Sequence, residues 1–320
     1  MQNKEYIENL DSFKNFVQDI KNNRLFHSIM LINKDGEFLR AYANRLSGEI
    51  LSVGKESPQN TLTKVEKEIH PDLFVLGREK PLDASESKDL VSSVLVAPYE
   101  GDRKVYIIEK FDEIASAPAN KLLKTLEEPP TGVTFILLVK NESRVLQTLL
   151  SRSQKFYLEG YSTDFVANYL SEMGEKESYL IALQSENSLE DAKKLAMGGN
   201  SRRMADFVLD TFSNFKKTTE LAKTLTRAEE FKEDLHELFN FFASVAEMSI
   251  RYQAGIKKDS KGWIEERIES VANEWNYLGL VGVIEACLTA HKMLESYVQS
   301  SNCLDQFFLK ILEVRRKCKI

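Results

Sequence analysis

The sequence contains few cysteines, and none precedes position 287. Cys287, Cys303 and Cys318 are the three cysteines among 320 residues, and they lack the paired CxxC spacing of most structural zinc sites. We therefore expect reduced thiols and no bound metal. The chain also has no uninterrupted apolar stretch near the ~20 residues that a membrane-spanning helix needs. Its first residues, MQNKEYIENLDSF, carry acidic side chains and no apolar signal core, which predicts a cytoplasmic protein that does not contact a membrane.

An excess of positive charge is missing as well. The chain has 43 Lys and Arg against 49 Asp and Glu, a net charge of −6. Because proteins bind phosphate backbones through Lys and Arg, this balance argues against a chain that wraps DNA over its whole surface, although it allows a local basic face. Hydrophobic residues make up 42% and charged residues 29%, as in ordinary soluble proteins, and the length allows two or three domains.

The most informative stretch is residues 104–153. Residues 105–108 (VYII) predict a strand, and a helix follows that begins near Ser116 and ends at a pair of prolines. Residues 133–139 are almost all apolar, which is typical of a strand buried on both faces, and residues 144–150 predict a second helix. Strands and helices that alternate at this spacing predict a parallel sheet covered by helices.

The remaining elements divide the chain into three predicted domains. Residues 4–20 predict a helix and residues 25–32 a strand, and both belong with the central stretch to an α/β domain of residues 1–160. Three short helices are expected in a small domain of residues 161–210. Residues 211–320 predict helices alone. The expected fold class is therefore α/β plus all-α.

The residues of the central stretch are informative in themselves, beyond their periodicity. NKLLKTLEEPP at residues 120–130 is followed by an apolar strand, by Asn141 and by Ser151-Arg152-Ser153. This string resembles the delta-prime family of clamp-loader subunits of bacterial DNA polymerase III, which are AAA+ proteins. The resemblance implies an AAA+ (RecA-like) parallel-sheet core over residues 1–160. It also implies a small helical lid over residues 161–210 and a helical collar over residues 211–320 that joins the subunits.

The resemblance places a nucleotide site after the first strand, and this chain lacks its main residues. ATP-binding members carry G-x-x-x-x-G-K-[ST] there, because glycines let backbone N–H groups approach phosphate while the lysine and hydroxyl serve phosphate and Mg²⁺. The corresponding run here is NKDGEFLR. Asn33 and Phe38 replace the two glycines, and Gly36 remains between them. Leu39 replaces the lysine, and Arg40 replaces the hydroxyl residue.

The acidic pair that should follow the 105–108 strand is changed too. Active family members have Asp-Glu there, one residue to hold Mg²⁺ and one to orient the attacking water, whereas this chain has Glu109 and Lys110. A lysine cannot act as that carboxylate. We therefore predict no intrinsic ATPase activity and no bound cofactor. The zinc module that the family often carries is not expected either, because residues 47–69 contain no cysteine.

One motif of the family is kept, Ser151-Arg152-Ser153, although its third residue is usually a cysteine. The guanidinium group is planar and permanently charged, and so it can bridge phosphate oxygens as charge builds on them. The resemblance implies that Arg152 acts in trans, as an arginine finger at the nucleotide of a neighbouring subunit. A surface arginine in a turn is the alternative.

Other charged and polar residues near these motifs have weaker assignments. Asn141 corresponds to the first sensor of the family, and Arg203, or else Arg202, to the second; without a bound phosphate they would shape a turn or bridge domains. Glu127 and Glu128 are interpreted as solvated charges on a helix face that also carries lysines.

The function that the resemblance implies is that of a stator, a clamp-loader subunit that does not hydrolyse ATP. Its partners would be gamma/tau-like motor subunits and a delta-like subunit, and the assembly would load the sliding clamp onto primed DNA. By association, the chain would belong to the DNA polymerase III holoenzyme, a DNA-directed DNA polymerase. Two other functions remain open: a divergent ATP-binding AAA+ motor subunit, and a DNA-binding or adaptor protein on an inactive AAA+ scaffold.

Overall fold

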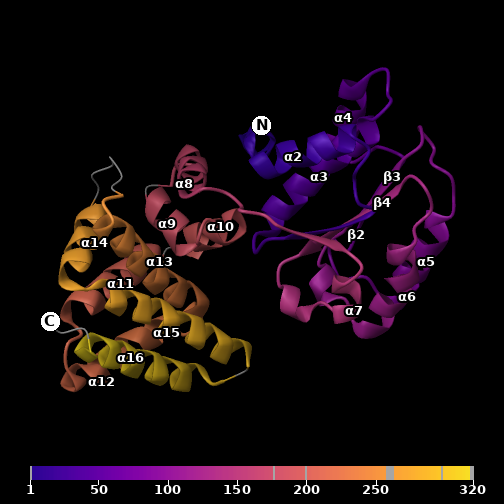
Figure 1. The fold of residues 1–320 in the computed structure, drawn as a ribbon. Coiled ribbons are helices and arrows are strands. Elements are labelled where there is room, and N and C mark those ends of the chain that lie inside the picture. The colour runs from indigo at the N-terminus through magenta and orange to yellow at the C-terminus, as the bar shows by residue number, and fades with distance from the viewer. Residues whose placement is uncertain (1, 176, 199, 257–262, 297, 318–320) are drawn as a thin grey trace. The chain divides into compact units, whose positions relative to one another are not determined.

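A computed structural model describes residues 2–175, 177–198, 200–256, 263–296 and 298–317 (Figure 1). The chain divides into two compact units, residues 1–160 and 161–320. The first unit contains the sheet, and the second consists of helices. The predicted fold class, an α/β core followed by an all-α region, is confirmed. The further division of the second unit at residue 210 stays a prediction.

The first unit is built on five parallel strands in the order β2-β3-β4-β1-β5. The strands are β1 (Ser28–Ile32), β2 (Leu73–Leu76), β3 (Lys104–Ile108), β4 (Val133–Val139) and β5 (Gln154–Tyr157). Every residue of β1, β3 and β4 is buried, which explains why these strands are nearly continuous apolar runs. The predicted strand over residues 133–139 is confirmed to the residue.

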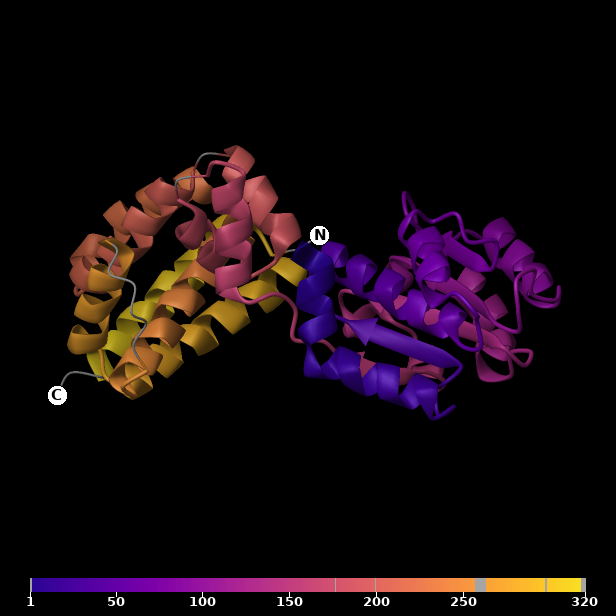
Figure 2. The same cartoon turned by 90° about the horizontal axis from the view of Figure 1, so that it is seen from above.

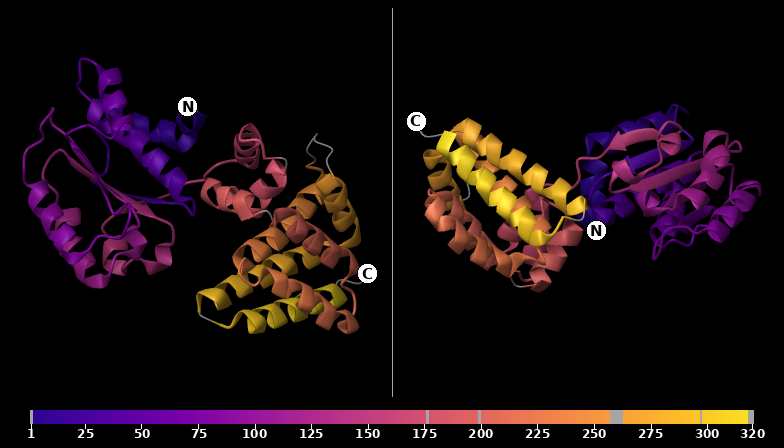
Figure 3. Two further views of the ribbon diagram at one scale, coloured as in Figure 1. Left: turned by 180° about the vertical axis from the view of Figure 1, so that it is seen from behind. Right: turned by 90° about the horizontal axis from the view of Figure 1, so that it is seen from below.

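Helices cover both faces of this sheet. They are α1 (Gln2–Asn9), α2 (Asp11–Lys21), α3 (Gly36–Ser52), α4 (Pro58–Glu66), α5 (Ala84–Val94), α6 (Ser116–Glu127) and α7 (Gln147–Leu150). The helices α2 and α3 lie on one face, and α5, α6 and α7 on the other (Figure 3). The apolar stripe predicted for α6 is confirmed, because Ala119, Leu122 and Leu126 are buried in the core beneath the second face.

Two helices of the first unit differ from the prediction. The single helix expected over residues 4–20 is two helices, α1 and α2, because Leu10 between them has an extended backbone (φ −65°, ψ 136°). The helix expected over residues 144–150 is a 3₁₀ turn, Glu142–Arg144, followed by the short α7. Val145 separates them with an extended backbone, and its side chain is buried in the core.

The second unit contains helices and, among the described residues, no strand (Figure 2). The helices are α8 (Thr163–Glu172), α9 (Ser178–Gln184), α10 (Leu189–Gly198), α11 (Ser201–Asn214), α12 (Leu221–Ala228), α13 (Leu235–Gln253), α14 (Trp263–Glu274), α15 (Tyr277–Glu295) and α16 (Ser300–Lys317). In the described part of residues 161–210, four helices begin rather than three, and α11 continues past that boundary. Leu180 and Leu183 of α9 share one apolar core with residues of α13 and α16.

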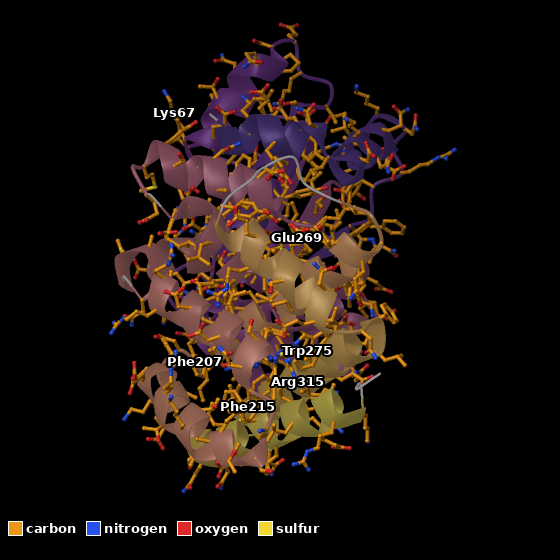
Figure 4. All side chains as sticks on the ribbon, turned by 90° about the vertical axis from the view of Figure 1, so that its left-hand side faces the viewer. Lys67, Phe207, Phe215, Glu269, Trp275 and Arg315 are labelled. Atoms are coloured by element: carbon orange, nitrogen blue, oxygen red, sulfur yellow. The ribbon has the colours of Figure 1, made fainter. Side chains whose placement is uncertain are left out.

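Aromatic side chains fill the core of the second unit. Phe242 of α13 contacts Phe307 and Phe308 of α16 in edge-on geometry, an arrangement that aromatic rings favour. Trp275 donates from Nε1 to the carbonyl oxygen of Phe212 at 3.0 Å. The guanidinium of Arg315 lies over the Trp275 ring, 4.5 Å from its centroid (Figure 4). Burial lowers the pKa of Arg315.

The helix α15 is the one described helix that is long and apolar enough to cross a membrane. Its neighbours explain that composition, because α15 packs between α13 and α16 and contributes Leu280, Val283 and Cys287 to the core. Cys287 and Cys303 are both free and buried, and burial raises the pKa of each thiol. Cys318 lies outside the described residues.

Candidate functional site

The turn between β1 and α3, where a P-loop would lie, is closed by its own side chains. Asp35 is 2% exposed and is the N-cap of α3. Its Oδ1 accepts hydrogen bonds from the backbone N–H groups of Glu37 at 2.8 Å and Phe38 at 3.1 Å. These are donors of the kind that a helix N-terminus offers to phosphate. Here a carboxylate of the chain takes that place.

A second set of bonds fixes the same turn. Asn33 accepts a hydrogen bond at Oδ1 from the backbone N–H of Asp35 at 2.8 Å. Its Nδ2 donates to the carbonyl oxygen of Leu158 at 2.8 Å. Gly160 passes close to this amide, since an added Cβ would lie 3.0 Å from Asn33 Nδ2. Asn33 therefore ties the turn to the segment after β5, a role that a glycine could not fill.

Arg40 and Glu109, which the family resemblance predicts at the Mg²⁺ positions, bind each other. Arg40, in the second turn of α3, donates from Nε to Glu109 Oε1 at 2.9 Å and to Oε2 at 3.0 Å. Glu109 follows β3 and is only 4% exposed. The hydrogen bond to Glu109 raises the pKa of Arg40. A buried carboxylate is thus neutralised by a guanidinium of the same chain.

Two further residues extend this ion pair towards the surface. Arg78 Nε lies 3.4 Å from Glu109 Oε1, and Arg78 Nη2 lies 2.6 Å from Glu68 Oε1. The bond to Arg78 lowers the pKa of Glu68. The network therefore alternates two cations with two anions, so that none of its four charges lacks a partner of the opposite sign.

The other residues expected at a nucleotide site contact other residues of their own chain. Phe38 and Leu39 are buried in the core beneath α3, so the position of the lysine is apolar and closed to water. Lys110 has a left-handed backbone (φ 51°), and its Nζ donates to the carbonyl oxygen of Glu79 at 2.6 Å. Gly36 is the first residue of α3.

Asn141 caps the 3₁₀ turn that follows β4. Its Oδ1 accepts from the backbone N–H of Ser143 at 3.0 Å. Its own backbone N–H donates to Asp112 Oδ2 at 2.9 Å, and Asp112 is buried. The side chain of Asn141 thus shapes a turn, which is the role expected without a nucleotide.

The Ser-Arg-Ser motif lies between α7 and β5. Arg152 Nε donates to Glu127 Oε2 at 2.9 Å, and Arg152 Nη1 donates to the carbonyl oxygen of Thr148 at 2.8 Å. The side chain of Arg152 is 31% exposed. Ser151 Oγ donates to the same Thr148 carbonyl at 3.2 Å. Ser153 is buried, and its Oγ lies 3.0 Å from Ser28 Oγ on β1.

The two arginines predicted for the second sensor lie in the other unit, at the start of α11. Arg203 donates from Nη2 to Asn200 Oδ1. Arg202 pairs with Glu177, at 3.3 Å from Nη1 to Oε1, and with Asp206, at 3.5 Å from Nε to Oδ2. Both arginines are exposed.

Comparison with known proteins shows a family match over most of the first unit. The family described as "DNA polymerase III, delta subunit" matches residues 9–162. These residues, slightly less than half of the chain, are similar to that family. The matched segment contains the capped turn, the Arg40–Glu109 pair and Arg152. The predicted resemblance to the family is confirmed over these residues. The five-stranded parallel sheet agrees with the α/β core that the sequence predicted.

Relatives of the DNA polymerase III family match parts of the chain. The Pseudomonas aeruginosa subunit delta' is 42% identical over 87 residues, 26% of each chain. The gamma/tau subunit of Mycoplasma pneumoniae is 30% identical over 169 residues, 53% of this chain and 23% of that one. The present chain therefore matches about a quarter of the length of these relatives. A gamma subunit-related protein of Thermotoga maritima has a solved structure that is 15% identical, covers 96% of this chain and 100% of its own, and gives a TM-score of 0.43.

Sequence reasoning missed two residues of this site. Asp35 was passed over as a member of a degenerate loop, although an Asp directly before a helix start is a common N-cap. The sequence predicts Glu127 to be a solvated helix charge, but its carboxylate accepts a hydrogen bond from Arg152, which lies 25 positions later. A pattern based on i, i+4 spacing cannot detect that contact.

Proposed function

We propose that this protein is a clamp-loader subunit of DNA polymerase III that does not hydrolyse ATP and that supplies Arg152 to a neighbouring ATPase subunit. The observation that carries the proposal is the pair formed by Arg40 and the buried Glu109. It fills the positions that would hold Mg²⁺, while Arg152 keeps a partly exposed guanidinium. Such a subunit would be a stator: it contributes to catalysis without a nucleotide of its own.

Nucleotide binding in this chain would be opposed at each contact. A phosphate group would have to displace the Asp35 carboxylate from the N-terminus of α3, and a metal ion would have to displace Arg40 from Glu109. Leu39 offers no charge to phosphate, whereas the P-loop lysine does. Lys110 offers no carboxylate to orient water. These features support the absence of ATPase activity and of a bound cofactor.

Arg152 would act on the nucleotide of another subunit. Arginine fingers stabilise the charge that develops in phosphoryl transfer and contribute about 10³–10⁵ to the rate in GTPases. Ser151 and Ser153 would hold the turn, since each side chain bonds a neighbouring element. Asn141 would keep its turn in shape. Arg203 would bridge neighbouring segments of the helical unit or meet solvent.

The second unit would hold the chain in its assembly. Large apolar side chains are exposed there on α15 and α16, including Leu278, Leu288 and Leu309. Burial of such residues between subunits is typical of a stable interface. The partners would be gamma/tau-like motor subunits and a delta-like subunit in the cytoplasm. The assembly would act on the sliding clamp and primed DNA.

The test is Arg152→Ala in the complex reconstituted with its own motor subunits. We expect full assembly but a loss of at least tenfold in DNA- and clamp-stimulated ATPase, because the finger would stabilise the charge that develops in phosphoryl transfer. Arg152→Lys keeps the charge but not the planar fork, and it should restore little activity. Unchanged ATPase in a fully assembled Arg152→Ala complex would refute the finger.

Binding measurements on the isolated chain test the other two functions. Calorimetry should detect no micromolar affinity for Mg-ATP, and a clear signal would favour a motor subunit. Tight, salt-sensitive binding to primed DNA would favour a DNA-binding protein, because phosphate contacts release counterions.

A further inference from the structure

Arg152 is held from two sides by its own chain. The Nε–H goes to Glu127, and one N–H of Nη1 goes to the Thr148 carbonyl. Among the residues that the structure describes, Nη2 has no hydrogen-bond partner. A guanidinium carries five N–H donors in one plane, so these two bonds fix the plane and leave the Nη2 donors for a ligand.

The groups that hold Arg152 are themselves fixed by the fold. Glu127 is the last residue of α6, directly before Glu128 and the two prolines that end the helix. Thr148 lies in α7, whose C-cap residue Ser151 bonds the same carbonyl. On the other side, Ser153 is buried against β1. The backbone of Arg152 is therefore anchored before and after the residue, and Glu127 fixes the side chain.

We infer that Glu127 is a positioning residue, which orients the Arg152 guanidinium towards a phosphate bound by a neighbouring subunit. The inference rests on the proposed function, because it requires Arg152 to act in trans. A free arginine has many rotamers, and a finger must stop in one of them before the phosphate arrives. Glu127 would hold Arg152 in one rotamer before the phosphate binds, which is preorganisation.

The contact between Glu127 and Arg152 is suited to orienting the guanidinium, and it is too weak to hold Arg152 away from a phosphate. The side chains are 31% exposed at Arg152 and 52% exposed at Glu127. Water screens ion pairs at this exposure, and their contribution to stability is small. The contact can therefore choose an orientation without preventing Arg152 from meeting a phosphate.

The experiment compares variants in the fully reconstituted complex, with assembly checked by native mass spectrometry. Glu127→Ala removes the acceptor, and we expect kcat for stimulated ATP hydrolysis to fall about three- to tenfold, the cost of immobilising a flexible side chain. The apparent affinity for ATP should not change, because the nucleotide lies in another subunit. Glu127→Gln keeps an acceptor oxygen and should retain most of the rate. Glu128→Ala removes the same charge from the adjacent residue, which forms no hydrogen bond with Arg152 among the described residues, and serves as the matched control.

The outcomes separate this inference from the proposed function. An unchanged rate for Arg152→Ala refutes the proposed function itself. A low rate for Arg152→Ala with a normal or raised rate for Glu127→Ala refutes only the positioning role. Equal losses for Glu127→Ala and Glu127→Gln would show that charge, and not orientation, matters, and would also overturn the inference. Loss of assembly in Glu127→Ala would assign the residue to the interface instead.

Discussion

Replacing Arg40 by methionine should destabilise the first unit by about 2 kcal/mol. Removal of one partner from a fully buried ion pair costs about 3–5 kcal/mol, because the other charge stays buried without compensation. Glu109 is 4% exposed, but the Arg40 side chain is 39% exposed, so water already screens part of this pair. Arg78 also remains 3.4 Å from Glu109. Both facts reduce the expected cost to about 2 kcal/mol.

The chain allows each unit to be followed separately. Both tryptophans, Trp263 and Trp275, belong to the second unit, so tryptophan fluorescence reports on that unit while far-UV circular dichroism reports on both. A urea m-value of about 2 kcal/mol/M converts the expected loss into a fall of roughly 1 M in the midpoint. In Arg40→Met this fall should occur in the circular dichroism transition of the first unit and not in the fluorescence transition.

Two controls make the result interpretable. Arg144→Met removes an exposed arginine of the same unit and should leave the midpoint unchanged. The double variant Arg40→Met, Glu109→Gln removes both charges, and should be more stable than the sum of the single changes by about 1–3 kcal/mol, since the partners are in contact. An unchanged first transition in Arg40→Met, or strict additivity in the double variant, would refute the view that this pair replaces the metal site.

Three further changes are expected to have local effects. Gly132→Ala should lower the stability of the first unit, measured by circular dichroism, because φ is +84° and the added Cβ would lie 2.1 Å from the Asp102 carbonyl oxygen. Backbone hydrogen bonds at the start of α5 lower the pKa of Asp83 to about 2, from an ordinary value of 3.8. Its capping contribution should therefore be present above pH ~4 and be lost as the pH falls towards ~2, as NMR titration of the carboxyl group can check. Leu288→Glu should leave both unfolding transitions in place but weaken binding to partner subunits, measured by native mass spectrometry, because this side chain is 59% exposed.

The sequence predicts best where local pattern and tertiary structure agree. The strand β4 is continuous and apolar, and it lies in the middle of the sheet, so its bounds follow from composition alone. The helix α6 ends at Glu127, ahead of two prolines that cannot continue it. Leu10 is neither a proline nor a glycine, so the sequence does not predict the break between α1 and α2. The end of α11 at Asn214, past the predicted boundary at residue 210, likewise depends on packing within one shared core.

The candidate site is predicted only in part, for a physical reason. The predicted absence of a P-loop lysine and of an acidic pair follows from single residues of the sequence, Leu39 and Lys110. The contact between Arg40 and Glu109 joins positions 69 apart, and no local pattern indicates that two replaced residues bind each other. Asp35 gives a local cue, since it precedes the helix start. Residues 33–40 therefore lack the P-loop residues and also form a helix cap, and the comparison with a P-loop indicates only the first of these.

The capped turn between β1 and α3 has a consequence for the energetics of the assembly. A protein that binds ATP gains stability by mass action, about 2.7 kcal/mol when the ligand is present at 100 times its Kd. On the proposed function this chain gains nothing, because Asp35 and Arg40 supply permanently the contacts that ATP and Mg²⁺ would supply only while bound. Its melting temperature should then be the same with and without ATP. As its neighbours bind and release nucleotide, this subunit would keep one conformation and be a fixed point against which their movements act.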